Sequence, residues 1–361
     1  MKILGIDIGA GTKDVLLYDS EKRVENCTKM VLPSPTILCA KKIRNSKNDL
    51  YISGHTIGGG ELVTTLKRHI ENGHKVTMTE EAAFTLYNRL ERVKSLGITI
   101  EEKPVDGFSG EHINFDEVNA DQLRAFLLST SESLEGFDAI AIAVQDHGVP
   151  PANVSQNRFR LEKFKERFLQ EPHVDASIFF DDVPQCYVRM RSAVRSVKKS
   201  FPGVRTFVMD STLAAMAGCL CDRPSPLAGA IAVNIGNSHV TASLITDRIV
   251  GFMEHHTSLL TPEKLGQLLR RLGSGKLTDE EVSGDGGPGS FYLTDEVIEE
   301  EHVVLATGPR RMMIANSGVG FHFAAPTGDV MMTGAFGLVK AVEKALEKTR
   351  QQRSGAVSAS G

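Results

Sequence analysis

The sequence contains few cysteines, and their spacing supports no common cysteine-based structure. Five cysteines occur among 361 residues, and no two of them form a C-x-x-C pair. An odd count in a large chain argues against a disulfide framework, and the missing pair argues against a zinc ribbon. Cys219 and Cys221, the one closely spaced pair, fit two small buried side chains near a helix end; a metal cluster or redox pair is the alternative.

Long apolar runs and a large excess of one charge are also missing. No uncharged apolar stretch approaches the roughly 20 residues of a membrane span. The N-terminus lacks the basic, apolar and small-residue regions of a signal peptide. The formal net charge of -4 gives no electrostatic reason to bind nucleic acid or an anionic membrane. We therefore expect a cytoplasmic protein that binds neither nucleic acid nor membrane.

The composition is that of a soluble globular protein, with 41% hydrophobic and 24% charged residues. A chain of 361 residues exceeds one ordinary core, so we expect an α/β protein with two lobes. Pro224 to Pro226 marks the boundary between them. We predict an N-terminal lobe with an inserted region at residues 1–222, a C-terminal lobe at residues 223–348 and a disordered tail at residues 349–361.

The first fourteen residues carry the most distinctive pattern. An apolar run from Ile3 to Ile8 precedes the turn Gly9-Ala10-Gly11-Thr12-Lys13-Asp14, and a second apolar run follows from Val15 to Tyr18. This pattern predicts a buried strand, a tight glycine turn and a return strand. Glycines let backbone N–H groups approach and surround a phosphate. Asp7, near the end of the first strand, is a candidate to hold a divalent ion through water.

A second segment repeats this design. Ala230 to Val233 predicts a strand, Asn234-Ile-Gly236-Asn237-Ser238-His239 a turn, and the alternating residues up to Ile245 a return strand. Two phosphate-type turns far apart in the sequence imply two similar half-domains that face one cleft.

Polar residues at the ends of two other predicted strands are further candidates. The apolar run from Ala139 to Val144 delivers Asp146 and His147, and ligands of open α/β sheets bind beyond such strand ends. A loop that only caps its own backbone is an equal alternative. Asp210 precedes a helix of small residues from Thr212 to Leu220, which can pack closely against another element.

The remaining patterns leave more than one interpretation open. Gly58 to Gly60 fits an anion-binding turn or a flexible turn before a helix. Thr79 to Leu96 predicts one amphipathic helix, and Arg158 to Lys165 predicts another ordinary amphipathic helix. His255 and His256 favour structural or surface roles over metal binding.

The two commonest nucleotide motifs are absent. A Rossmann fingerprint needs a third glycine, but Asp14 stands there and a strand follows where a helix is required. A Walker loop needs Gly-Lys-Ser/Thr, but the only Gly-Lys pair, Gly275-Lys276, is followed by leucine. The glycine turns therefore indicate a nucleotide-binding fold other than these two.

The motifs, in their order, resemble those of the superfamily of actin, the heat-shock chaperones and the sugar kinases. The matching segments are the first phosphate motif at Ile6–Thr12, the first connecting helix at Asp210–Gly218, the second phosphate motif at Asn234–Ser238, the adenosine motif at Val303–Arg311 and the second connecting helix at Asp329–Gly337. Five pieces in the right order are more specific than any one of them. The resemblance implies two ribonuclease-H-like lobes around a cleft that holds ATP and Mg2+ and closes by a hinge.

The residue patterns and this resemblance together give the candidate site residues. Asp7, Asp146 and Asp210 are the catalytic candidates, and Asp7 is also the candidate metal ligand. The candidate nucleotide-binding residues are Gly9, Ala10, Gly11, Thr12, Lys13, Asn234, Gly236, Asn237, Ser238, Thr307, Gly308 and Arg310.

Within the superfamily, the sequence resembles an uncharacterised archaeal and bacterial family that is labelled as pyruvate formate-lyase activating. The resembling blocks are Ala143–Gly148, Glu254–Thr257, Thr307–Arg311 and Gly328–Gly334. A radical activator of that type uses a C-x-x-x-C-x-x-C motif, which this sequence lacks.

One residue departs from the superfamily pattern. The second phosphate motif normally begins with aspartate, where this chain has Asn234. Asparagine cannot supply the charge that attracts magnesium or polarises an attacking water, and losing such a group commonly costs about a hundredfold in rate. Either one of the three catalytic candidates compensates, or the protein binds nucleotide and turns it over poorly.

Three functions follow from these patterns. We expect ATP hydrolysis or phosphoryl transfer to an unidentified acceptor. The first alternative is an ATP-driven activator of a partner metalloenzyme, in which Cys219 and Cys221 would matter. The second is a nucleotide-gated binding protein without catalysis, which Asn234 favours. The expected partners are thus a nucleotide and an unidentified acceptor or partner protein.

Overall fold

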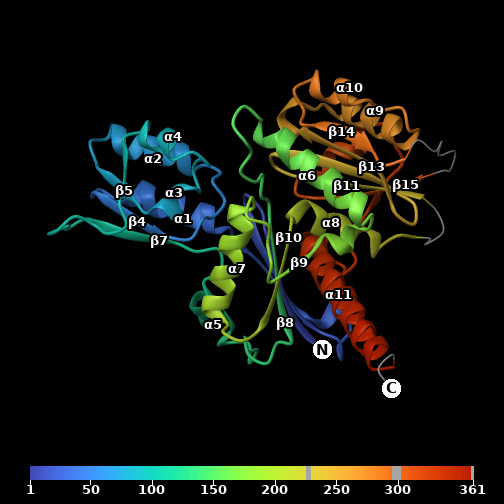
Figure 1. The fold of residues 1–361 in the computed structure, drawn as a ribbon, viewed down its shortest axis with the longest axis horizontal. Helices are drawn as coiled ribbons and strands as arrows, with labels where there is room; N and C mark the ends of the chain where they lie inside the picture. Colours follow the sequence, from blue (N-terminus) through green and yellow to red (C-terminus); the bar gives the residue numbers. More distant parts are fainter. Residues whose placement is uncertain (225–228, 295–301, 359–361) are drawn as a thin grey trace.

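The structure is a computed structural model that describes residues 1–224, 229–294 and 302–358. Within these residues the chain forms two six-stranded sheets and a smaller four-stranded sheet (Figure 1). The two large sheets stack with helices between them and on both outer sides, while the smaller sheet forms a separate subdomain at one side.

The first large sheet contains the first predicted hairpin. Its strands, in order across the sheet, are β3 (Thr28–Pro33), β2 (Thr12–Asp19), β1 (Lys2–Ile8), β8 (Ala139–Val144), β10 (Arg205–Met209) and β9 (Phe179–Phe180). β1, β2 and β3 pair antiparallel, whereas β8 and β10 run parallel to β1. Side chains on both faces of β1 are buried because helices cover the sheet on both sides.

The second large sheet repeats this order. Its strands are β14 (Gly289–Tyr292), β13 (Ile249–His256), β12 (His239–Ile245), β11 (Gly229–Ile235), β15 (His302–Thr307) and β16 (His322–Phe323). As in the first sheet, three strands (β11, β12 and β13) pair antiparallel, and two more (β15 and β16) continue in parallel from β11. β14 adds a fourth antiparallel strand at the outer edge, beside β13. This repeated arrangement is the ribonuclease-H-like topology. It confirms the predicted fold class, the actin-like ATPase fold.

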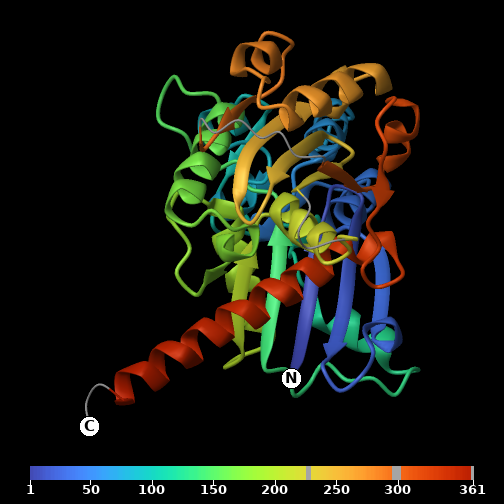
Figure 2. The ribbon, with the colours of Figure 1, turned by 90° about the vertical axis from the view of Figure 1, so that its right-hand side faces the viewer.

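Helices fill the space between the large sheets and cover their outer faces. α8 (Ser211–Leu220) and α11 (Thr333–Ser358) lie between the sheets, where Gly337 packs against the backbone of Gly218 (Figure 2). The outer helices are α5 (Ala120–Leu127) and α7 (Val188–Ser200) on the first sheet and α9 (Pro262–Gly273) and α10 (Asp279–Ser283) on the second. The predicted small-residue helix thus makes the close contact that its composition indicated.

Two helices cross the predicted boundary between the lobes. α6 (Gln156–Gln170) belongs to the first segment of the chain, yet its Phe164 and Phe168 rings stack on Phe252 of the second sheet. α11 belongs to the second segment, yet it packs on β1 and β8 of the first sheet. The division at residue 222 stays a prediction, and residues 225–228 lie outside the described part.

The prediction of a disordered tail at residues 349–361 is wrong for residues 349–358. α11 continues to Ser358, whereas the sequence predicted a helix end near Lys348. Residues 349–358 contain no proline that would break the helix, so they extend α11 without interruption. Residues 359–361 lie outside the described part of the chain.

The small subdomain is inserted between β3 and β8. Its parallel sheet has the strand order β6 (Ile98–Ile100), β5 (Val76–Met78), β4 (Leu50–Gly54) and β7 (Glu111–Phe115). Its helices are α1 (Pro35–Asn45), α2 (Leu62–Glu71), α3 (Glu80–Ala83) and α4 (Leu90–Lys94). It has its own apolar core, separate from the cores beside the large sheets.

The predicted single helix from Thr79 to Leu96 is wrong: α3 and α4 are separated by an irregular segment at residues 84–89. The break forms because this segment bonds to other parts of the chain. Thr85 Oγ1 accepts from the N–H of Ile57 at 3.0 Å, and Asn88 Nδ2 donates to the carbonyl of Gly148 at 2.6 Å. Short 3-10 turns complete the structure: η1 (Val24–Asn26), η2 (Val174–Ser177), η3 (Thr257–Leu259), η4 (Arg311–Asn316) and η5 (Val330–Met332).

Candidate functional site

Two glycine turns lie beside each other at one cavity. The first joins β1 to β2 at residues 9–11, and the second joins β11 to β12 at residues 236–238. In each turn the N–H of the first glycine donates to the carbonyl three residues later, at 2.9 Å. A Cβ added to Gly11 would lie 3.6 Å from Asn237 Nδ2, so the turns contact each other. The cavity beside them has a volume of about 440 Å3.

Most of the candidate site residues line this cavity. The sequence-predicted residues at its surface are Asp7, Gly9, Ala10, Gly11, Thr12, Asp146, Asn234, Gly236, Asn237, Ser238, Thr307 and Gly308. Gly308, with a φ of +100°, brings the backbone close to Asn234 and Ile235, where a Cβ would collide. Three segments far apart in the sequence therefore meet as the predicted motif order requires.

Lys13 and Arg310 do not line the cavity. Lys13 alternates to the opposite face of β2 from Asp14 and is 2% exposed. Burial lowers the pKa of Lys13, and the nearby Glu117 carboxylate partly offsets this effect. Arg310 is exposed, and its backbone N–H donates to the carbonyl of Ile235. Its predicted nucleotide contact therefore has no counterpart in this cavity.

Asp210 is likewise absent from the cavity surface. It is the N-cap residue of α8 and is 2% exposed. Its Oδ1 accepts from Arg160 Nη2 at 2.8 Å and from the N–H of Thr212 at 2.9 Å. A carboxylate that is paired with a buried guanidinium caps and orients its neighbours. In this arrangement Asp210 is engaged by Arg160 and by the start of α8, and its role as a catalytic base stays a prediction.

Asp146 lines the cavity and also caps backbone groups. Its Oδ1 accepts from the N–H of Gly148 at 2.8 Å, and its Oδ2 accepts from the N–H of Met190 near the start of α7 at 3.0 Å. Burial raises its pKa, although both backbone donors favour the charged form. Both sequence interpretations, a capped loop and a residue at the ligand-facing strand end, therefore describe part of this residue's environment.

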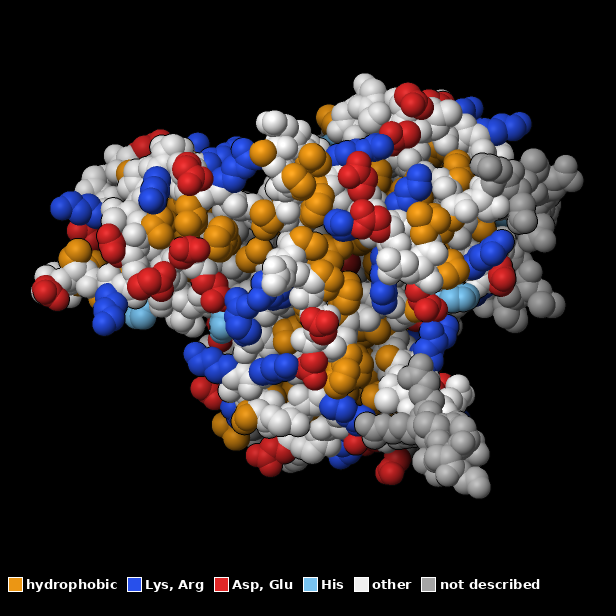
Figure 3. Space-filling view, viewed as in Figure 1, with side chains coloured by type: hydrophobic (Ala, Val, Ile, Leu, Met, Phe, Trp, Pro, Cys, Tyr) orange, Lys and Arg blue, Asp and Glu red, His pale blue; other side chains and the backbone are white. Residues whose placement is uncertain are grey.

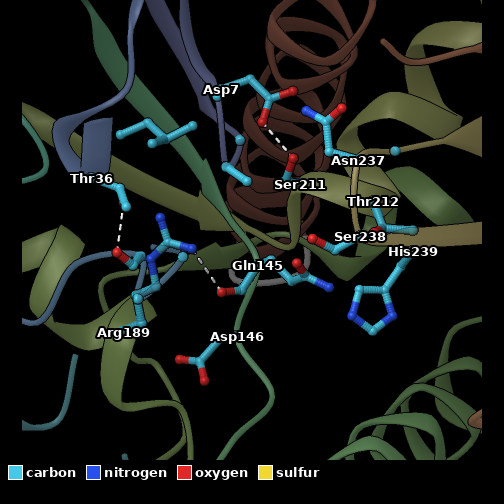
Figure 4. Close-up of a pocket in the computed structure, with 18 of the residues that line it drawn as sticks. Asp7, Thr36, Gln145, Asp146, Arg189, Ser211, Thr212, Asn237, Ser238 and His239 are labelled. Carbon is cyan, nitrogen blue, oxygen red and sulfur yellow. Dashed lines mark hydrogen bonds between the residues drawn. The ribbon is translucent and has the colours of Figure 1, made fainter. Parts of the chain in front are cut away.

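The first hairpin carries two buried carboxylates side by side. Asp7 on β1 pairs in register with Asp14 on β2, so both side chains lie on the same face of the sheet. Burial raises the pKa of Asp7 to about 7, and the hydrogen bond that Ser211 Oγ donates to its Oδ1, at 2.6 Å, counteracts this rise (Figure 4). Burial and the charge of Asp7 raise the pKa of Asp14 to about 8.

This carboxylate pair fits a divalent cation. Asp14 Oδ1 is buried and has no hydrogen-bond partner among the described residues. The start of α11 closes the space beside the pair, because a Cβ on Gly334 would collide with Asp7 Oδ2. Neither of these adjacent carboxylates forms an ion pair with another described residue, although the charge of Arg189 slightly lowers the pKa of Asp7. Oxygen-rich sites of this kind suit Mg2+.

The inserted subdomain forms a wall of the cavity that the sequence did not identify. Thr36 on α1 and the irregular segment at residues 84–88 line it together with Gly58 to Gly60. Thr36 Oγ1 donates to the carbonyl of Gly58 at 2.6 Å (Figure 4). From the sequence, Gly58 to Gly60 fitted either an anion-binding turn or a flexible turn before a helix. These three glycines were the only signal in the sequence for this wall.

Arg189 on α7 brings a positive charge to the same wall. Its Nε donates to Glu117 at 2.6 Å, and its Nη1 donates to the carbonyl of Gln145 at 3.0 Å (Figure 4). Its guanidinium lies close to Gly58, where a Cβ would come within 3.1 Å of Nη2. No motif marked Arg189 in the sequence, because its neighbours come from three separate segments.

A cluster of histidines forms the wall opposite Arg189. His147 and His239 line the cavity, with ring centroids 5.4 Å apart, and His256 lies 4.9 Å from His239. Burial, followed by the charge of Arg160, lowers the pKa of His147 to about 3. Behind them Glu254 contacts both His239 and Arg160. His255 is separate: it is fully buried and pairs with Asp285 at 3.0 Å.

No group of three or more His, Cys, Asp or Glu side chains suited to a metal ion occurs among the described residues. Within residues 1–224, 229–294 and 302–358, no helix combines the length and the apolar character that a membrane span requires. On the molecular face in Figure 3, acidic and basic side chains are interspersed.

Solved structures that are similar to the chain share little sequence with it. A polyphosphate/ATP-glucomannokinase from Arthrobacter sp. strain KM has 12% identity and a TM-score of 0.36, with 96% of this chain and 99% of that chain covered. The activator of 2-hydroxyisocaproyl-CoA dehydratase from Clostridium difficile, with bound ADPNP, has 8% identity and a TM-score of 0.35, with 97% and 98% covered.

A protein with an actin-like ATPase fold from Bacteroides thetaiotaomicron has 7% identity and a TM-score of 0.37, with 92% of this chain and 94% of that chain covered. No curated protein matches the sequence. A family model described as "Putative pyruvate format-lyase activating enzyme (DUF1786)" matches residues 57–313, and the chain belongs to this family.

Proposed function

We propose that the chain binds ATP together with a divalent cation in this cavity and transfers the terminal phosphoryl group to water or to an acceptor. The observation that carries the proposal is the pair of uncompensated carboxylates, Asp7 and Asp14, next to two facing glycine turns. Buried like charges are costly unless a ligand neutralises them, and a cation with phosphate oxygens does so. Backbone N–H groups of glycine turns are suited to the phosphates.

The parts of the cavity have separable roles in this proposal. Asp7 and Asp14 would hold the cation, the two turns would hold the phosphates, and Thr307 with Gly308 would lie against the nucleoside. The cation, when bound, neutralises charge on the transferred phosphoryl group. The inserted subdomain and Arg189 would contact the acceptor, because they form the wall that lies away from the nucleoside segment.

Calorimetric titration of ATP, with and without MgCl2, tests the proposal directly. We expect Mg2+ to strengthen ATP binding by at least about tenfold, and Asp7→Asn to abolish that difference because it removes the negative charge that attracts the cation. Phosphate release should fall about a hundredfold or more in the same variant. Glu347→Gln removes an exposed carboxylate of α11 and serves as the matched control.

Two outcomes would count against this function. ATP affinity that is equal with and without Mg2+ in the native chain would remove the cation from the proposal. Tight Mg2+-dependent binding without phosphate release would favour the nucleotide-gated binding protein, the candidate that Asn234 in place of aspartate supports.

A further inference from the structure

His239 lies where the second turn meets the cavity. It is the first residue of β12, directly after Ser238, and its side chain is 13% exposed. Figure 4 shows its imidazole on the side of the cavity opposite Arg189, with Gln145 between them. Imidazole is the common general base of proteins near neutral pH, so its support by neighbouring groups decides what it can do.

Glu254 supplies that support from the next strand. Its Oε1 lies 2.9 Å from His239 Nδ1, and the carboxylate is 1% exposed. Burial alone would raise the pKa of Glu254, but Arg160 and His239 hold it at about 2. The carboxylate is therefore charged at neutral pH. Its charge, 2.9 Å from Nδ1 but not aligned for a hydrogen bond, favours a proton on Nδ1 of His239 and leaves Nε2 as an acceptor.

The other titratable groups around His239 differ from it. Burial lowers the pKa values of His147 and His256, so both rings are neutral at pH 7. Among the described histidines, His239 is the one that lies within ion-pair distance of Glu254. Arg160, on the far side of Glu254, is fully buried and pairs with Asp210 as well. His239 is thus the ring of this cluster that combines exposure to the cavity with a charged carboxylate at Nδ1.

The carboxylates that the sequence offered as bases are engaged elsewhere. Asp210 is paired with Arg160 and does not line the cavity, and both oxygens of Asp146 accept backbone N–H groups. Asp7 belongs to the pair that suits a cation. We propose that His239 accepts the proton of the attacking hydroxyl or water, and that Glu254 is the positioning residue that holds its ring.

This inference rests on the proposed function. The attacking oxygen forms a bond to the terminal phosphorus with one of its electron pairs, and its proton moves to His239 Nε2. The bond from phosphorus to the bridging oxygen breaks, and its electron pair leaves with the nucleoside diphosphate. Water and any acceptor with a hydroxyl group meet this requirement, so hydrolysis is the simplest assay.

The test compares variants of the full chain with Mg2+ and ATP. His239→Gln should lower the rate of phosphate release about 100- to 1,000-fold, as loss of a general base does, and change ATP affinity less than threefold. Glu254→Gln should lower the rate by at least tenfold, and Glu254→Asp should restore part of it. His256→Gln is the matched control, because His256 neighbours His239 without lining the cavity.

A readout that does not depend on activity separates positioning from general structural damage. Long-range proton–nitrogen NMR of the histidine rings should find His239 with its proton on Nδ1 in the native chain. Glu254→Gln should change that tautomer population, whereas His256→Gln should not. Thermal unfolding of each variant verifies that it is folded, and Glu254→Asp provides a second variant if Glu254→Gln is unstable.

Each outcome has a distinct meaning. Rates for His239→Gln within fivefold of the native chain, or a proton on Nε2 in the native chain, overturn this inference and leave the proposed function standing. Bound ATP with no turnover in the native chain also overturns it. No ATP binding at all overturns the proposed function, a result that calorimetry identifies before any variant is compared.

Discussion

The two hairpins share a backbone but differ in how their charges are arranged. Asp7 and Asp14 of the first hairpin correspond in register to Asn234 and Thr241 of the second. The second hairpin is therefore neutral at both positions. Its nearest carboxylate is one strand further out, because Glu254 on β13 pairs with Thr241.

These arrangements leave the two carboxylate groups in opposite states. Burial raises the pKa values of Asp7 and Asp14 to about 7 and about 8, and neither carboxylate forms an ion pair with another described residue. Glu254 has the positive partner Arg160 built into the protein, and its pKa is about 2 although burial opposes this. The first hairpin is therefore suited to bind a cation from solution. Beside the second hairpin, the guanidinium of Arg160 already supplies the positive charge.

Arg160→Met tests the built-in cation and should have the largest effect on stability. The change leaves Glu254 and Asp210 buried without their shared partner, which typically costs about 3–5 kcal/mol. Denaturant unfolding at pH 7 measures the loss. Arg158→Met, two residues away on the same helix and half-exposed, is the control, with an expected loss of less than about 1 kcal/mol.

The pH dependence of the same variant has a definite sign. The folded pKa of Glu254, about 2, is below its ordinary value of 4.5, so its contribution to stability is present above pH 4.5. That contribution is lost as the pH falls toward 2. The stability gap between the native chain and Arg160→Met should therefore narrow below pH 4.5, and a gap that stays constant would contradict the assignment.

Asp14→Asn tests whether the first hairpin lacks a cation. Here we expect the free energy of unfolding to rise, whereas in Arg160→Met it should fall. Removing one of two buried like charges should stabilise the metal-free protein at pH 8 by about 1–3 kcal/mol. Added Mg2+ should stabilise the native chain and have little effect on the variant. Unfolding with and without MgCl2 measures both effects. A variant that is less stable than the native chain without Mg2+ would show that Asp14 is already compensated.

The sequence was sufficient for the parts of the molecule that depend on local patterns. Each hairpin is defined by an apolar run, a glycine turn and a return strand, and the structure has β1–β2 and β11–β12 at these places. The small residues before Leu220 similarly predicted the tightly packed α8. Such elements are encoded within about twenty residues, so one sequence suffices to find them.

The parts that were missed depend on contacts between distant segments. Arg160 lies in a segment that the sequence predicted as an ordinary amphipathic helix. Its role in a buried charge network was missed because its two carboxylate partners are 50 and 94 residues away. The break at residues 84–89 forms through bonds to Ile57 and Gly148. The periodicity within one segment does not indicate such bonds. The bonds of Arg160 form a buried charge network, and the bonds of residues 84–89 form a cavity wall.

Asn234→Asp asks whether the second hairpin lacks a carboxylate or has replaced it. If His239 with Glu254 has taken over proton transfer, the change alone should alter phosphate release less than about threefold, because the step already has an acceptor. In the His239→Gln background it should raise the rate about tenfold, since the new carboxylate lines the same cavity. Asn234→Ser in that background is the control and should rescue nothing. A tenfold gain from Asn234→Asp alone would mean that the missing carboxylate of the second hairpin limits the rate. Glu254 would then have only a structural role.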